Sequence, residues 1–382
     1  MLQLADIFRD AGGAYRERYG SRMPPSHKKA MRAIVECRTA ALGGQLYECD
    51  HCGRKEFSYH SCRNRHCPKC HRAQTDRWLD RQRRRLPACP YFLVTFTVPA
   101  ELRNLIRSHQ RTGFRILFSA AARSLFKLAN DPRCLGACPG ALAVLHTWTR
   151  ALVYHPHVHM LVTAGGLPEG TDQWVEPRRP GFLMPGYALS RIFRATFKDG
   201  LRRAGLLASV PAKVWSKDWV VHLQHAGSGE RALEYLARYV FKVALVNSRL
   251  EQYDSGRVTF RYRDNRTRKL QHATLEVHEF IARFLQHVLP ARFTKVRSYG
   301  LFAPSNGKKL LRVRDALRAP ATLPTRHPSP APPDASHSEK SLDTTTLDTE
   351  APDGGSLHRC TGCETGMMRL IDIIPRQWRS PP

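Results

Sequence analysis

The sequence is poor in acidic residues. It has 32 Asp and Glu against 61 Lys and Arg, which gives a formal net charge of +29 at pH 7. A charge of this size opposes compaction and favours a polyanionic partner. The basic residues are spread along the chain, whereas binding to an anionic membrane would favour one basic amphipathic helix or a basic tail. The charge therefore predicts a nucleic acid partner and no membrane partner.

Long hydrophobic runs are absent as well. A membrane-spanning helix needs about 20 consecutive apolar residues, and the longest apolar run, residues 91–100, suits a buried strand better. Early charges at Asp6, Arg9 and Asp10 do not fit a secretion signal. We therefore expect a soluble, cytoplasmic protein. In that compartment the eleven cysteines, six of them within residues 37–70, indicate metal binding rather than disulfides.

Composition and periodicity divide the chain into five parts. We expect a helical segment at residues 1–36, a zinc-binding domain at 37–88 and a large α+β domain at 89–318. A disordered linker rich in Pro, Ser, Thr and Asp should follow at 319–358, and a tail at 359–382. Within the large domain, strand patterns fall at 91–98, 141–148, 157–162, 219–224, 257–263 and 272–276, and helix patterns at 100–129, 188–204, 229–246 and 277–288. Strands adjacent in sequence, with helices between them, predict a mainly antiparallel sheet with flanking helices.

Two Cys-x2-Cys pairs have the spacing of a zinc ribbon. Fourteen residues separate the pair Cys49 and Cys52 from the pair Cys67 and Cys70. Two such turns place four thiolates around one tetrahedral ion and leave no position open for water. We therefore predict one structural zinc site made of these four cysteines, without a role in the reaction.

Further cysteine and histidine residues surround these pairs. Cys37, Cys62, His66 and His71 either form a second metal site or are small buried and surface residues near the first. Four arginines in and after this region, Arg63, Arg65, Arg81 and Arg84, are candidates for DNA contact. Two of them lie on a basic helix predicted over residues 72–85, and the alternative is a solvated basic surface.

The segment His155-Pro156-His157-Val158-His159 is a candidate metal-binding strand. Residues i and i+2 of a strand share a face, so His157 and His159 point the same way. Two neighbouring imidazoles can hold one divalent cation. The alternative is a half-buried strand whose polar face uses histidine.

A helix predicted over residues 229–246 carries two tyrosines. Tyr235 and Tyr239 are i and i+4, so they lie on one face. Arg231 and Lys242 fall near the same side at about 100° per residue. The alternative is ordinary aromatic packing at the edge of the apolar stripe.

Together, the two pairs provide the parts of a phosphoryl-transfer site. A neutral tyrosine hydroxyl, with a pKa near 10, attacks poorly. A cation such as Lys242 favours the phenolate, and a divalent ion polarises the scissile phosphate. Attack on phosphorus gives a phosphotyrosine, and rejoining needs no ATP. The sequence therefore predicts Tyr235, Tyr239 and Lys242 as catalytic residues and His157 and His159 as ligands of the ion.

These motifs resemble the insertion-sequence-ninety-one family of rolling-circle transposases, whose nuclease is of the His-hydrophobic-His (HUH) class. The resemblance covers residues 1–315 and 360–368. It is carried by Ile7-Phe8-Arg9 with Tyr15-Arg16, by residues 37–44 and 61–70, by Leu145-His146-Thr147-Trp148 with residues 155–159, by residues 234–239, and by residues 280–300.

The resemblance implies an HUH sheet with the tyrosines on a facing helix, Mg²⁺ or Mn²⁺ at His157 and His159, and single-stranded DNA at element ends and target DNA as partners. It also implies association with the bacterial nucleoid. Such proteins often carry a histidine two residues after the second tyrosine, where this chain has Phe241. Other residues must then complete the site, with His146, His155, His222 and Gln224 as the candidates.

Two other functions fit parts of the sequence. A plasmid rolling-circle replication initiator or relaxase would share the nicking chemistry but has no reason to carry a zinc domain. A non-catalytic zinc-ribbon regulator that binds nucleic acid would explain the charge and the cysteines but not the histidine and tyrosine pairs. The final pair, Cys360-x2-Cys363, is half a zinc knuckle and indicates a decayed or shared site.

Overall fold

The computed structural model describes residues 1–70, 72–241, 243–264, 267–318 and 358–377. They form three antiparallel sheets with packed helices, which confirms the α+β class. The predicted linker, residues 319–358, lies outside the described residues except for its last position. Within the described ranges, no helix is both long enough and apolar enough to cross a membrane.

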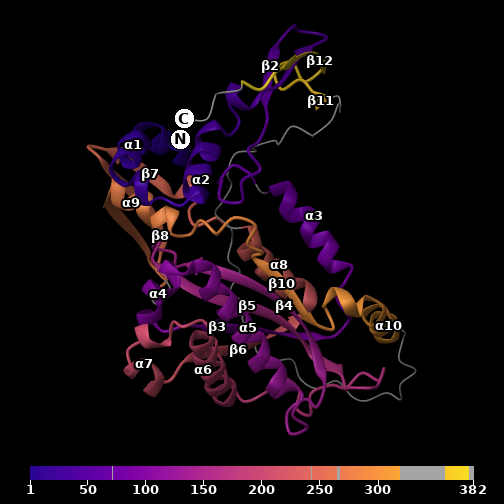
Figure 1. The fold of residues 1–382 in the computed structure, drawn as a ribbon. Coiled ribbons are helices and arrows are strands. Elements are labelled where there is room, and N and C mark those ends of the chain that lie inside the picture. Colours follow the sequence, from indigo (N-terminus) through magenta and orange to yellow (C-terminus); the bar gives the residue numbers. More distant parts are fainter. Residues whose placement is uncertain (71, 242, 265–266, 319–357, 378–382) are drawn as a thin grey trace.

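The central sheet has five antiparallel strands in the order β10-β4-β5-β3-β6 (Figure 1). The strands are β3 (Pro90–Thr97), β4 (Cys138–Trp148), β5 (Tyr154–Leu167), β6 (Val220–Ser228) and β10 (Val296–Gly300). The sequence patterns predicted all of these strands except β10. Strands β4 and β5 are buried along almost their whole length.

Helices cover both faces of this sheet. Successive residues of β3 point to opposite faces: Phe92, Val94 and Phe96 pack with α5 (Gln110–Ala129) and α6 (Gly186–Arg203), whereas Tyr91 and Leu93 pack with α8 (Gly229–Phe241). Helix α8 contacts β3, β4, β5 and β6. The remaining helices of this part are α4, α7 and α10, at Arg103–Ser108, Lys213–Ser216 and Gly307–Arg318.

Strand β6 turns sharply into α8. Ser228 pairs with Pro90 at the end of β6 where α8 begins, and Val220 pairs with Thr97 at the other end. A Cβ on Gly229 would lie 2.7 Å from the Tyr91 ring, so only glycine allows this close approach. Helix α8 therefore starts above the Pro90 end of the sheet and runs back over the face that carries Leu93.

A second core joins the N-terminal helices to residues 244–288. It is formed by α1 (Leu4–Tyr19), α2 (Pro25–Glu36), the three-stranded sheet β7-β8-β9 and α9. These last elements are Leu250–Asp254, Arg257–Arg263, Leu270–Glu276 and Val277–Leu285. The rings of Phe8 and Phe284 meet edge to face with centroids 5.5 Å apart. The N-terminal helices thus pack on residues that follow them by more than 200 positions.

The third sheet combines residues from near both termini. Its order is β11-β12-β1-β2, at His358–Arg359, Met367–Ile374, Gly44–Cys49 and Lys55–Tyr59. Strand β12 pairs along the whole of β1. Figure 1 shows this sheet at the top of the molecule, away from the central sheet, with the basic helix α3 (Arg72–Arg83) between them.

Candidate active site and metal centres

Three histidines meet on the face of the central sheet that α8 covers. His157 and His159 alternate along β5 and share that face, as predicted. The register pairs His146 of β4 with His157, so His146 lies on the same face. One nitrogen of each ring lies within 4.8 Å of the others, and all three residues are buried.

Hydrogen bonds orient these rings. The Nδ1 of His157 is 2.6 Å from the carbonyl oxygen of His155 and must donate to it, because a carbonyl only accepts. The Nε2 of His157, 3.0 Å from Nδ1 of His146, then offers a lone pair to the cluster. The Nδ1 of His159 is 3.0 Å from the hydroxyl oxygen of Thr95, which turns the other ring nitrogen away from that strand. This is the arrangement that outer partners give to metal-binding histidines.

Burial keeps these imidazoles neutral. It lowers the pKa of His146 and of His157 well below 6.5, and the neighbouring histidines lower both further. Burial also lowers the pKa of His159 to about 4. The neutral imidazole is the form that binds metal. Three converging neutral nitrogens therefore fit a divalent cation.

The register selects one of the four residues considered as a further ligand. His155 is not part of the described cluster, and its Nδ1 accepts a hydrogen bond from Arg103 at 2.7 Å. His222 and Gln224 are exposed on the edge strand β6. Only His146 of these four joins His157 and His159 in the described cluster.

Helix α8 carries the two predicted nucleophiles over this face. Its buried side chains, which include Leu233 and Leu236, pack on the sheet, and the side chain of Tyr235 is 38% exposed. Tyr239 lies one turn further along α8, but its side chain lies outside what the structure describes. Lys242 lies outside the described residues altogether. Their catalytic roles therefore stay predictions.

Lys295, which the sequence did not single out, holds the C-terminal end of α8. Its ammonium donates to the carbonyl of Val240 at 3.2 Å and lies 5.0 Å from the centre of the Trp148 ring. The Trp148 ring centroid is in turn 4.0 Å from that of His146. Burial, together with the neighbouring charge of Arg65, lowers the pKa of Lys295 to about 7. This chain of contacts brings the end of α8 close to the histidine cluster.

The basic helix α3 packs against α8. Arg83 forms an ion pair with Glu234, the neighbour of Tyr235, at 3.0 Å and another with Asp80 at 3.2 Å. Arg81 is exposed on this helix, and Arg84 is exposed on the turn that follows it. A strand of DNA bound along α3 would therefore run toward the tyrosine helix.

The cysteines form two clusters, so the prediction of one site from Cys49, Cys52, Cys67 and Cys70 is wrong. One cluster is Cys37, Cys62, Cys67 and Cys70, and the other is Cys49, Cys52, Cys360 and Cys363. The physical reason is the β1-β2 hairpin. Cys49 and Cys52 lie at its tip, whereas the remaining N-terminal cysteines lie at its base, about 17 Å away for five residues of strand.

The residues between these cysteines tie the first cluster to the rest of the protein. Arg65 donates to the carbonyl oxygen of Phe293 at 2.6 Å, and the backbone N–H of Leu289 donates to Nε2 of His66 at 3.3 Å. His66 belongs to neither described cluster, so its predicted role as an additional ligand is wrong, and His71 lies outside the described residues. Arg63 is exposed, as DNA contact requires, and its role stays a prediction.

Known proteins match both halves of this arrangement. Residues 7–98 match the family described as "Transposase zinc-binding domain", and residues 140–309 match the family described as "Putative transposase". "Putative transposase y4qJ" of Sinorhizobium fredii is 36% identical over 404 residues, which cover 98% of each chain. "Transposase for insertion sequence element IS801" of Pseudomonas savastanoi pv. phaseolicola is 32% identical over 315 residues, which cover 76% of this chain and 74% of that protein. No solved structure shows a significant match.

Proposed function

This chain belongs to the insertion-sequence-ninety-one family of transposases, and from that premise we propose that it nicks and rejoins single-stranded DNA through a tyrosine, as a metal-dependent HUH nuclease. A transposase acts on DNA, which is the kind of polyanionic partner that the net charge of the chain predicts. The observation that carries the proposal is the convergence of His146, His157 and His159 beneath the end of the helix with Tyr235 and Tyr239.

The histidine cluster is the proposed site of the divalent cation. Its three neutral nitrogens face one another. Outer hydrogen bonds to the carbonyl of His155 and the hydroxyl of Thr95 fix which nitrogen His157 and His159 offer. Mg²⁺ prefers oxygen ligands, so this all-imidazole set favours Mn²⁺ over Mg²⁺. When bound, the ion would polarise the scissile phosphate and stabilise the charge that develops on it.

The tyrosines supply the covalent step. The phenolic oxygen of Tyr235 or Tyr239 forms a bond to phosphorus and loses its proton. The bond between phosphorus and the 3′ oxygen breaks, and that oxygen takes a proton and leaves as a free hydroxyl. The product is a 5′-phosphotyrosine, which a 3′ hydroxyl can attack to restore the phosphodiester. Two tyrosines allow two strand ends, from the element and from the target DNA, to be held in succession.

The first cysteine cluster has a separate, structural role in this proposal. Cys37, Cys62, Cys67 and Cys70 would hold a Zn²⁺ ion with all four positions filled by protein, which leaves no site for a reacting water. The ion would fix the base of the hairpin and the start of α3, which packs on α8.

Cleavage of a labelled single-stranded oligonucleotide carrying an element end tests the nuclease assignment. We expect a covalent protein–DNA adduct that forms with Mn²⁺ or Mg²⁺ and not with a chelator. The variant Tyr235→Phe, Tyr239→Phe keeps both rings, so it should bind DNA but form no adduct. Tyr187→Phe, a matched change at an exposed tyrosine, should cleave normally. An adduct that persists in the double variant would show that another tyrosine is the nucleophile.

A further inference from the structure

We propose that Cys49, Cys52, Cys360 and Cys363 bind a second zinc ion, which fastens the C-terminal strands to the tip of the N-terminal hairpin. The matched zinc-binding domain ends at residue 98 and holds only the first two of these cysteines. The other two follow them by more than 300 positions. This inference is independent of the nuclease reaction proposed above.

The sulfur positions have the spacing of a tetrahedral zinc site. The Sγ atoms of Cys49 and Cys363 are 3.7 Å apart, and so are those of Cys52 and Cys360. Four sulfurs each about 2.3 Å from one ion would be about 3.8 Å apart. A disulfide would need about 2.05 Å, and all four cysteines are free. The spacing therefore fits thiolates around one ion.

The two turns that present these cysteines have the same local geometry. The residue after the second cysteine of each pair is left-handed, with φ of +68° at Gly53 and +56° at Glu364. The backbone N–H of His51 donates to Sγ of Cys49 at 3.5 Å, and that of Gly362 donates to Sγ of Cys360 at 3.3 Å. Each tail cysteine thus has a counterpart in the hairpin.

The first cluster, which lies within the matched zinc-binding domain, shares parts of this geometry, although Cys37 and Cys62 do not belong to a Cys-x2-Cys pair. Arg38 and Arg63, which follow Cys37 and Cys62, have φ of +57° and +51°. Positive φ is uncommon for residues other than glycine. Its recurrence after cysteines of both clusters indicates that the two clusters present their thiols to an ion in a similar way. The backbone N–H of Asn64 also donates to Sγ of Cys62 at 3.5 Å.

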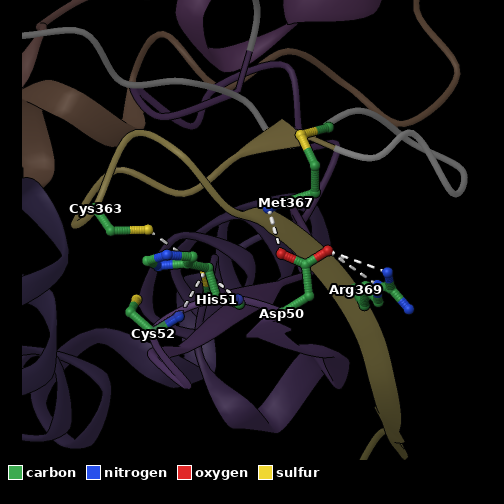
Figure 2. Close-up of polar contacts among 7 residues, drawn as sticks. Asp50, His51, Cys52, Cys363, Met367 and Arg369 are labelled. Atoms are coloured by element: carbon green, nitrogen blue, oxygen red, sulfur yellow. Dashed lines mark hydrogen bonds and ion pairs between the residues drawn. The ribbon is translucent and has the colours of Figure 1, made fainter.

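Close contacts hold the turn of Cys360 and Cys363 against the turn of Cys49 and Cys52. A Cβ on Gly366 would lie 2.4 Å from Sγ of Cys49, so the absence of a side chain permits the approach. The carboxylate of Asp50 accepts hydrogen bonds from the backbone N–H of Met367 at 2.8 Å and from Nε of Arg369 at 3.2 Å. Figure 2 shows Asp50 between Met367 and Arg369, with Cys52 and Cys363 on the side of His51 away from them.

These contacts surround the cluster with specific polar bonds. Strand β12 continues them as a ladder with β1, from the pair Cys49 and Met368 to the pair Gly44 and Ile374. The ion would close a loop of more than 300 residues at a single point. We therefore infer that the tail is an integral part of the zinc domain.

Zinc content of the full chain tests this inference. We expect two zinc ions per chain in the unchanged protein and one in the variant Cys360→Ser, Cys363→Ser. The control Cys134→Ser, Cys138→Ser changes two cysteines outside both described clusters and should keep two ions. One ion in the unchanged protein, two in the tail variant, or iron in place of zinc would overturn the assignment.

Alkylation of the unchanged protein provides a second test that does not depend on a variant folding. Cys52 is exposed and Cys363 is half-buried, so both thiols would react readily with iodoacetamide in the absence of metal. In the zinc-loaded protein, peptide mapping should find Cys49, Cys52, Cys360 and Cys363 protected, and a chelator should release all four together. Reaction of Cys52 and Cys363 at the same rate before and after chelation would contradict the proposal.

Discussion

At the scale of single residues, Thr95 bridges two strands and orients one histidine. Its hydroxyl lies 3.0 Å from Nδ1 of His159, and the register places Thr95 opposite His159 on β3. A rotating imidazole would offer either nitrogen to the cluster. The hydroxyl therefore reduces the conformational freedom that the ring loses when an ion binds.

The substitution Thr95→Val tests this role. Valine keeps the shape of the side chain but removes the hydrogen bond, so Mn²⁺ affinity should fall about 10- to 100-fold, as measured by calorimetric titration. The control is Thr97→Val on the same face. His157, opposite Thr97, is already oriented by the carbonyl of His155, so affinity should change little. Equal effects of the two substitutions would contradict a specific role for Thr95.

Residue spacing alone could identify part of this site. The alternation of His157 and His159 along one strand is local, so the sequence predicted their common face. The partner from β4 depends on the register between two strands, because a slip of one residue would turn His146 to the opposite face. The sequence therefore left His146 among four candidates, and it gave no indication of Lys295.

At the scale of elements, α8 is positioned at both of its ends. Its start is fixed by Gly229, which lies against the buried ring of Tyr91, and its end by the hydrogen bond from Lys295 to the carbonyl of Val240. Between them, Leu233 and Leu236 are fully buried. These contacts therefore fix the position of α8 and of the tyrosines that it carries.

The substitution Gly229→Ala should shift α8. The added Cβ would lie 2.7 Å from the ring of Tyr91, which is fully buried and donates its hydroxyl hydrogen bond to Pro87, and 3.0 Å from Leu86. Overpacking of this kind costs about 1–3 kcal/mol, so thermal unfolding should occur at a lower temperature and cleavage should weaken. Gly13→Ala in α1, where a Cβ meets nothing within 4 Å, should instead be neutral or stabilising. An unchanged melting temperature for Gly229→Ala would contradict this account.

Local pattern predicted some elements well and others not at all. The strands β3 to β6 and helices α6 and α8 have clear periodicity and overlap the predicted ranges, although β5 is longer and α8 shorter than predicted. The helix predicted over residues 100–129 is divided into α4 and α5. The pairing of β12 with β1 joins segments about 320 residues apart and has no local signature. The same limit explains the cysteines: spacing identifies each Cys-x2-Cys turn, but only the tertiary fold decides which turns share an ion.

At the scale of the whole molecule, the positive charge is distributed over both sides of the central sheet. The formal net charge is +29. Exposed arginines lie on α3, which packs against α8, the helix that carries the tyrosines. Other arginines lie on the opposite side of the sheet, on and after α5 and α6. If the DNA follows α3, removing two arginines on the α3 side should weaken DNA binding more than removing two arginines on the opposite side.

Salt dependence of single-stranded DNA binding makes that difference measurable. Each neutralised phosphate contributes a slope of about −0.7 to the logarithm of the binding constant against the logarithm of salt concentration. The variant Arg81→Ala, Arg84→Ala should therefore make the slope shallower by about 1.4 if each arginine contacts one phosphate. The control Arg133→Ala, Arg202→Ala removes the same charge from residues that pair with Asp131 and Asp199 beyond α5 and on α6, and it should leave the slope nearly unchanged. Equal slopes for the two variants would show that the DNA does not follow α3, and a binding constant insensitive to salt would refute the electrostatic argument as a whole.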